Sequence, residues 1–260
     1  MSDDLDCMVL AAGHMPSALA ARTGLQARGL VPVGGRPIID RVLDAVDGAE
    51  TVRDVAVVCG TGSPLLDHVG SRAVSSAGEG IVDSIRAGFA ALGGPARALV
   101  VTGDLPLLTA QSVDHFCREA LQSGASIVYS IINKADCERV FPGGRRTFVR
   151  LSDCVFTGGN VAVLSRQFVE TQAERLTAAF AGRKNPLRLC SLLGWGFVVR
   201  LLLGKLALVD IAQRGGALLG ADVHIVRSPY VEVGFDVDKP SDLDTVDEWL
   251  RSGPGGPSGS

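Results

Sequence analysis

Short apolar runs alternate with amphipathic segments along the first half of the chain. Runs of β-branched and aliphatic residues, typical of strands buried on both faces, occupy Cys7–Gly13, Val55–Cys59, Ala98–Thr102 and Ser126–Ile132. Between them, apolar residues recur at helical spacing in Arg36–Val46, Gly80–Leu92 and Ala110–Gln122. Strands that alternate with helices of this length predict crossover connections and a mostly parallel sheet covered on both faces. The predicted fold class is α/β.

The alternation is less regular beyond Phe141. Extended segments are predicted at Arg146–Leu151, Val155–Leu164, His224–Arg227 and Val231–Asp236. A long helical stretch is predicted from Arg166 to about Gly215, and a shorter helix over Pro240–Leu250. We therefore interpret residues 1–250 as one domain with a helical insertion at about 166–215. Residues 251–260, rich in Gly, Pro and Ser, are interpreted as a flexible tail.

The segment 186–208 within this insertion is apolar enough to raise the question of a membrane span. Arg188, Arg200 and Lys205 interrupt it, and its glycines weaken a continuous helix, so we expect no span. We favour helices that pack on the sheet or on a second subunit of a homo-oligomer. A second interpretation stays open, because no acidic residue lies between Glu174 and Asp210. A basic and apolar cap of this kind suits a phosphorylated or amphipathic acceptor, or a membrane surface.

Charge and cysteine content narrow the class of partner. The net charge of −3 and the sequence pI near 5.8 give no electrostatic reason to bind nucleic acid or an anionic membrane, so a small partner is expected. The cysteines stand singly, without a CxxC pair, at positions 7, 59, 117, 137, 154 and 190. We read no signal peptide before them and expect reduced thiols in a cytoplasmic protein.

Aspartates end two apolar segments. Asp104 follows the strand in VVTGDLPLL, where a carboxylate loses hydration, so we expect a positive partner for it. Other interpretations of Asp104 are a turn before Pro106 or a cap of the next helix. Asp236 and Asp238 flank one apolar residue, and an extended chain would point both to the same side, available to a metal. Alternatively, one of them caps the helix that begins near Pro240.

Four blocks of sequence, in this order and spanning nearly the whole chain, resemble one family. They are LAAG (Leu10 to Gly13), RGLVPVGGRPII (Arg28 to Ile39), GDLPL (Gly103 to Leu107) and GFDVDKPSDL (Gly234 to Leu243). The chain resembles the MobA-like nucleoside triphosphate transferases, within the sugar-phosphate nucleotidyltransferase superfamily of GT-A-like fold. The resemblance implies a Rossmann-like three-layer sandwich with a mixed, mostly parallel sheet.

The resemblance also implies a nucleotide site. In the family, the first loop cradles the triphosphate; here it comprises Leu10, Ala11, Ala12 and Gly13. The aspartate of the DxP block and an aspartate near the C-terminus hold a divalent ion. These positions correspond to Asp104 and Asp238, with Asp236 as an alternative, and the expected ion is Mg²⁺ or Mn²⁺, both of which suit oxygen ligands.

Two further segments resemble the family's binding surfaces. Gly78, Gly80 and Ser84 lie in a stretch like the one that meets base and ribose, although an ordinary helix N-terminus explains them equally well. Gly158, Gly159 and Asn160 resemble the acceptor-side strand, opposite the nucleotide. A glycine pair within a strand lowers stability, which favours a close-approach role for it.

The chain departs from the family pattern after LAAG. HMPSALAARTGLQAR replaces the usual glycine-rich segment, and Arg28 stands where relatives carry a lysine. Arginine keeps a permanent charge and binds phosphate through two parallel hydrogen bonds, so Arg28 is a predicted catalytic residue. Asp104, the expected metal ligand, is the other. Spare cations that could complete the site are Lys134, Arg145, Arg146 and Lys184. We interpret His14 as a polar surface residue, because no partner for it is evident.

These patterns predict transfer of a nucleoside monophosphate from a triphosphate to a phosphorylated acceptor, with release of pyrophosphate. The acceptor classes are a sugar phosphate, a phospho-alcohol or a molybdopterin-like cofactor. Two alternatives remain: a glycosyltransferase of the same architecture, and a nucleotide-binding regulatory protein whose altered loop no longer supports turnover. The candidate nucleotides are GTP, CTP, UTP and ATP.

Overall fold

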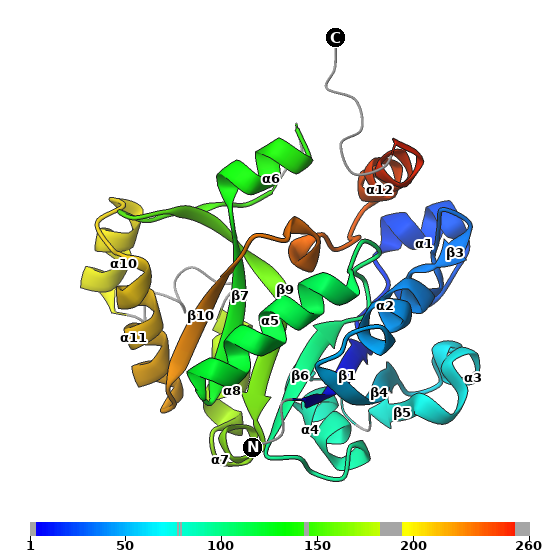
Figure 1. The fold of residues 1–260 in the computed structure, drawn as a ribbon, viewed down its shortest axis with the longest axis horizontal. Helices are drawn as coiled ribbons and strands as arrows, with labels where there is room; N and C mark the ends of the chain where they lie inside the picture. Colours follow the sequence, from blue (N-terminus) through cyan, green and yellow to red (C-terminus); the bar gives the residue numbers. More distant parts are fainter. Residues whose placement is uncertain (1–3, 77, 79, 143–145, 183–193, 253–260) are drawn as a thin grey trace.

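The computed structural model describes residues 4–76, 78, 80–142, 146–182 and 194–252, and is organised around one large sheet (Figure 1). Within these residues the sheet has eight strands, in the order β10-β7-β9-β6-β1-β4-β5, with β8 paired to β9. Their bounds are β1 (Leu5–Ala11), β4 (Val52–Gly60), β5 (Ala73–Ser76), β6 (Arg97–Thr102), β7 (Ile127–Asn133), β8 (Val149–Arg150), β9 (Val155–Ser165) and β10 (Val223–Ser228). A small antiparallel pair is formed by β2 (Pro32–Val33) and β3 (Arg36–Pro37).

Helices cover both faces of this sheet (Figure 1). The α-helices are α1 (Ser17–Thr23), α2 (Ile38–Asp47), α3 (Leu65–Val69), α4 (Ile81–Ala91), α5 (Ala110–Ser123), α6 (Lys134–Val140), α7 (Arg166–Thr171), α8 (Ala173–Gly182), α10 (Trp195–Leu202), α11 (Leu208–Leu219) and α12 (Pro240–Ser252). Short 3₁₀ helices are η1 (Arg28–Leu30), η2 (Gly70–Arg72) and η3 (Val231–Gly234).

Strand β1 shows why the sequence forms three layers. Cys7 and Val9 belong to the core cluster that contains α2 and α5, whereas Met8 belongs to the cluster that contains α4 and α7. Successive side chains of a strand point to opposite faces, so a continuous apolar run buries both. The three-layer α/β fold expected from the sequence is confirmed.

One antiparallel strand makes the sheet mixed and shapes its functional edge. β1 pairs in parallel with β4 and β6, whereas β9 runs antiparallel to β6 and β7. Leu10 at the end of β1 is paired with Thr102 at the end of β6. Gly158, in the first half of β9, is paired with Ile131 near the end of β7. The carboxyl ends of β1, β6 and β7 and the start of β9 therefore share one edge of the sheet.

One expectation for the second half of the chain was wrong, and two others hold in part. Val231–Asp236 is not a strand: Val231–Gly234 is the 3₁₀ helix η3, because β9 and β10 already occupy both edges of β7, against which η3 packs. The helical stretch expected from Arg166 to about Gly215 consists of the separate helices α7, α8, α10 and α11, with residues 183–193 outside the described part of the chain. Only Val149–Arg150 of the expected strand Arg146–Leu151 pairs with β9.

The inserted helix α10 packs one apolar face against the fold, half-buried, and leaves the other exposed. Phe197 and Leu201 pack on a small cluster with Leu206, whereas Trp195 and Leu202 on the outer face are 65% and 81% exposed. The expectation that this region packs on the sheet therefore accounts for the inner face alone. In the described part of the chain, no helix combines the length and apolar character needed to cross a bilayer.

The described cysteines are free thiols. Cys7, Cys59, Cys117 and Cys137 are buried and Cys154 is half-buried, while Cys190 falls outside the described residues. Burial raises the pKa of Cys59 to about 11 and that of Cys117 to about 12. These thiols are therefore protonated at neutral pH and act as small apolar core residues.

Candidate active site

The end of β1 opens into a pocket of about 490 Å³. Gly103 N donates a hydrogen bond of 2.9 Å to the oxygen of Leu10, and a Cβ added at Gly103 would lie 3.1 Å from that of Ala11. The loops after β1 and β6 are thus held close together, and glycine at position 103 permits this. The pocket is lined by Leu10, Ala11, Ala12, Gly13, His14, Arg28, Gly29, Gly80, Ile81, Ser84, Thr102, Gly103, Asp104, Asn160, Asp236 and Asp238.

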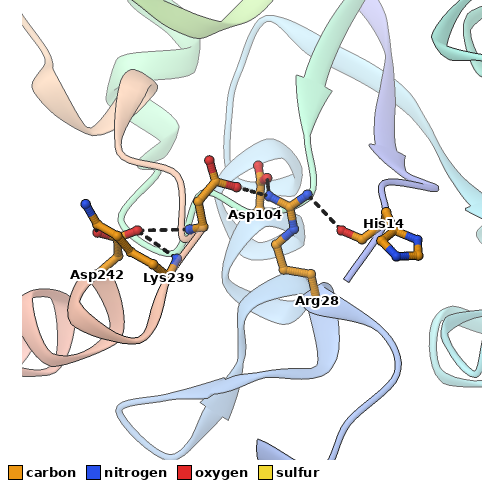
Figure 2. A network of polar contacts seen from close by, with 6 residues as sticks. His14, Arg28, Asp104, Lys239 and Asp242 are labelled. Carbon is orange, nitrogen blue, oxygen red and sulfur yellow. Dashed lines mark hydrogen bonds and ion pairs between the residues drawn. The ribbon is translucent and has the colours of Figure 1, made fainter. Parts of the chain in front are cut away.

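Arg28 bridges two aspartates that are far apart in the sequence. Its Nη1 donates to Asp104 Oδ2 at 2.5 Å and to Asp238 Oδ1 at 2.7 Å. Its Nη2 donates to the backbone oxygen of His14 at 3.4 Å, while the His14 ring points away (Figure 2). The side chains of Arg28 and Asp104 are only 17% and 15% exposed, whereas that of Asp238 is 61% exposed. The positive partner expected for Asp104 is therefore Arg28.

Other residues perform the helix capping considered for these aspartates. Thr109 is the N-cap of α5 and accepts a hydrogen bond from Ser112 N at 3.2 Å. At the start of α12, Asp242 Oδ2 accepts from the N–H groups of Asp238 and Lys239, each at 3.0 Å (Figure 2). Val237 N donates to Asp104 O at 3.2 Å. Asp104 and Asp238 are therefore free of capping roles, and backbone contacts fix their relative position.

Asp104, Asp236 and Asp238 together form an acidic cluster. Each offers a carboxylate oxygen within 4.8 Å of the others. Asp104 Oδ1 is buried and has no hydrogen-bond partner among the described residues. Burial raises the pKa of Asp104, and the charge of Arg28 opposes that shift. Burial and then the neighbouring charges of Asp104 and Asp238 raise the pKa of Asp236 to about 6.

The donor set of this acidic cluster fits a hard divalent cation. Carboxylate oxygens are the ligands that Mg²⁺ and Mn²⁺ prefer. A cation would also offset the mutual repulsion that raises the pKa of Asp236, and would give the unpaired Oδ1 of Asp104 a partner. The structure thus brings together all three aspartates expected as metal ligands, including the alternative Asp236.

The segment expected to meet base and ribose lies at the amino end of α4. Gly80 and Ser84 line the 490 Å³ pocket, and Ser84 Oγ donates to Ser76 Oγ and to Gly80 O, each at 3.3 Å. Gly80 is also the N-cap of α4, so this residue both begins an ordinary helix and lines the pocket. Gly78 does not line the pocket, because the Asp83 side chain packs against it.

The expected acceptor residues line a second pocket of about 880 Å³, which adjoins the first. Gly158, Gly159 and Asn160 all contribute to it. Added Cβ atoms at the two glycines would collide with the hydroxyl groups of Tyr129 and Ser130, respectively. Tyr129 Oη donates to Gly159 O at 2.8 Å. The close approach inferred for this glycine pair is therefore made at least in part by neighbouring side chains of β7.

The two pockets share three lining residues: Asn160, Asp236 and Asp238. The acidic cluster is therefore at the junction of a pocket beside the first loop and a pocket beside β9. A ligand in either pocket can reach the cluster.

Of the four cationic residues expected near the site, one lines a pocket, one does not, and two are outside the described residues. Arg146 lines the 880 Å³ pocket, donates to Gly234 O and stacks on the Phe235 ring, with 4.8 Å from Cζ to the ring centroid. Lys134 instead pairs with Glu138 at 3.3 Å and does not line either pocket. Arg145 and Lys184 are outside the described residues.

Sequence reasoning missed Lys239 and Tyr129, which line the acceptor-side pocket. Lys239 lies within the GFDVDKPSDL block, and its position in that block was a signal that could have identified it. Tyr129 gave no such signal, because it lies in a strand that reads as simple sheet interior. Tyr129 is 39% exposed, and the absence of a Cβ at Gly158 leaves room for its hydroxyl group.

Comparisons with known proteins agree with this geometry. Residues 7–220 match the family described as the MobA-like NTP transferase domain. A hypothetical transferase from Thermus thermophilus superposes with a TM-score of 0.79 at 34% identity, over 92% of this chain and 99% of that one. CMP:2-keto-3-deoxy-manno-octonic acid synthetase, in a complex with CTP, shares the fold with a TM-score of 0.62 at 13% identity, over 95% of this chain and 99% of that one.

Curated relatives match over a shorter stretch. The bifunctional protein GlmU of an Exiguobacterium species is 31% identical over 112 residues, which cover 41% of this chain and 25% of GlmU. The chain thus spans about a quarter or less of the length of the curated relatives that it matches. The family match, by contrast, covers most of the chain. This chain belongs to the MobA-like NTP transferase domain family, as its sequence motifs predicted, and its class is that of the nucleotidyltransferases.

Proposed function

We propose that this protein transfers a nucleoside monophosphate group from a nucleoside triphosphate to a phosphorylated acceptor and releases pyrophosphate. The observation that carries the proposal is the acidic cluster at the junction of the two pockets. Nucleotidyl transfer needs two ligands that meet at one point, with negative charge offset where they meet. The acceptor classes stay a sugar phosphate, a phospho-alcohol or a molybdopterin-like cofactor.

The residues divide the work between the two ligands. In the 490 Å³ pocket, the backbone of Ala11, Ala12 and Gly13, together with Arg28, binds the triphosphate. In the 880 Å³ pocket, Lys239 and Arg146 attract the phosphate of the acceptor. An acceptor phosphate oxygen attacks the α-phosphorus; a new P–O bond forms as the bond to the β-phosphate breaks, and pyrophosphate carries away the charge. No strong base is required, because the attacking oxygen is already anionic.

Asp104, Asp236 and Asp238 would hold Mg²⁺ or Mn²⁺, which supplies charge neutralisation at the phosphates. Burial, and then the charges of Asp104 and Asp238, raise the pKa of Asp236, and a bound cation would offset the repulsion between these carboxylates. The small acceptor and the nucleotide are the proposed partners, and the cytoplasm, where thiols stay reduced, is the proposed location.

Pyrophosphate release tests the proposal. The purified protein is incubated with ATP, GTP, CTP or UTP, Mg²⁺, and members of each acceptor class, and pyrophosphate is measured by a coupled assay. One productive pair of triphosphate and acceptor, inactive after EDTA, is the expected result. Turnover of a nucleotide sugar instead would show a glycosyltransferase. Triphosphate-dependent thermal stabilisation with no product from any acceptor would show a regulatory nucleotide-binding protein.

A further inference from the structure

A single guanidinium nitrogen occupies the position where the proposed ion would bind. Nη1 of Arg28 carries two hydrogens, and it donates one to Asp104 and one to Asp238 at 2.5 and 2.7 Å. These are two of the three carboxylates of the acidic cluster. Within the acidic cluster, the carboxylate oxygens that do not contact Arg28 are those of Asp236 and the second oxygens of Asp104 and Asp238.

This bridge opposes the binding of a cation. A divalent ion on the same oxygens would have to break two charge-assisted hydrogen bonds, the stronger class of hydrogen bond in proteins. It would also be repelled by the guanidinium, since arginine keeps its charge at every accessible pH. Because Arg28 and Asp104 are mostly buried, solvent screens this repulsion only in part.

Arg28 already touches the loop to which a triphosphate would bind. A Cβ added at Gly13 would lie 3.1 Å from Arg28 Nη2, and this same nitrogen donates to His14 O. The backbone of Arg28 is fixed in η1, where Val31 N donates to Arg28 O at 3.0 Å. The guanidinium can therefore move between the carboxylates and the loop through its own side-chain torsions, without a change of fold.

We propose that Arg28 is an internal counter-ion of Asp104 and Asp238. When phosphate oxygens in the first loop bind its guanidinium, Arg28 releases the two carboxylates, which then bind a divalent cation. Ion and nucleotide therefore bind with positive coupling, and each increases the affinity of the other by the same factor. This inference rests on the proposed function only in taking a triphosphate as the ligand of the loop. It assigns to Arg28 a role in the nucleotide-free protein as well.

Mn²⁺ binding to the nucleotide-free protein tests the counter-ion role of Arg28. Isothermal titration with MnCl₂ at pH 8 compares the wild type with Arg28→Gln. Removal of the competing charge is expected to tighten Mn²⁺ binding by at least about tenfold, the effect of one unit charge a few ångströms from an ionised group. Unchanged or weaker Mn²⁺ binding in Arg28→Gln would overturn the counter-ion role.

A matched control is Arg22→Gln. Arg22 forms an exposed ion pair with Asp244 at 2.5 Å, so the variant makes the same change in charge away from the acidic cluster. Its Mn²⁺ affinity should equal that of the wild type. Equal tightening in both variants would mean that only the overall charge matters, and would also overturn the proposal.

A third variant covers the case in which Arg28→Gln does not fold. Arg28→Lys keeps the charge, but an ammonium lacks the planar fork that reaches two carboxylates and the loop together. Its Mn²⁺ affinity should fall between those of the wild type and Arg28→Gln, and no gain over the wild type would contradict the proposal. The titration requires no turnover. Absence of pyrophosphate release from the wild type would instead count against the proposed function.

Discussion

The proposed nucleotide side and the proposed acceptor side of this site are built in different ways. On the nucleotide side, the loops after β1 and β6 extend from strands buried on both faces, and Gly103 N donates a hydrogen bond to Leu10 O. On the acceptor side, β9 carries an irregular register against β7, and the short strand β8 and the partly exposed helix α10 lie beyond it. The strands of the first region follow from local sequence pattern, whereas those of the second depend on packing between distant segments.

Core truncation should give the largest difference between these regions. Phe116 on α5 is fully buried in the main core cluster, so Phe116→Ala should lower the free energy of unfolding by about 3–5 kcal/mol. Leu202→Ala on the outer face of α10, where the side chain is 81% exposed, should change it by less than about 0.5 kcal/mol. Urea denaturation measures both. A large loss in Leu202→Ala would show that the outer face of α10 is covered.

The acidic cluster should make stability depend on pH in the metal-free protein. The folded-state pKa of Asp236 is raised to about 6, so the folded protein holds its proton more tightly than the unfolded chain does. The stabilising contribution is complete below the ordinary pKa near 3.8 and is lost as pH rises to about 6.

The expected loss across that window is about 1–3 kcal/mol, since one pKa unit corresponds to about 1.4 kcal/mol. Asp236→Asn should abolish this part of the pH dependence in urea denaturation at pH 4 to 7. The exposed Asp244→Asn serves as the control. An unaltered pH profile in Asp236→Asn would contradict the raised pKa of Asp236.

The smallest expected effect separates the two pockets kinetically. Lys239 lines only the acceptor-side pocket, so Lys239→Met should raise the KM for the acceptor by about tenfold, the effect of one charge-assisted contact. The KM for the triphosphate should stay unchanged. Lys134→Met, which lies outside both pockets, should alter neither constant. A rise in the triphosphate KM of Lys239→Met would reverse the assignment of the pockets.

Local pattern predicted the longer strands and helices of the first half of the fold, but not short elements such as α1, α3 and β5. Cys7–Gly13 and Ala98–Thr102 were identified as strands because residues buried on both faces leave a continuous apolar run. Pattern was wrong for Val231–Gly234, whose alternation suits a strand, because no free edge of β7 was left to pair with. Whether a strand has a free edge depends on the topology of the whole sheet, and a short stretch of sequence contains no information about it.

The candidate site was predictable in its residues but not in its contacts. Asp104 and Asp238 came from motif resemblance, and the structure brings them together. The Arg28 bridge was not predictable, because it joins positions separated by 76 and 210 residues through side-chain geometry alone. Gly78 does not line the pocket that contains Gly80, since the Asp83 side chain lies against it, and its nucleotide-binding role stays a prediction.

Pyrophosphate release by Asp104→Asn tests the central claim most directly. The amide keeps the shape of Asp104 but removes the buried charge at the junction of the pockets, while Asp238 still pairs with Arg28. Mg²⁺-dependent release should fall by about a hundredfold or more, the usual effect of losing one electrostatic element of an active site. The melting temperature should show that the variant is folded. A folded Asp104→Asn variant that releases pyrophosphate within about twofold of the wild-type rate, far from the loss expected for such an element, would contradict the account.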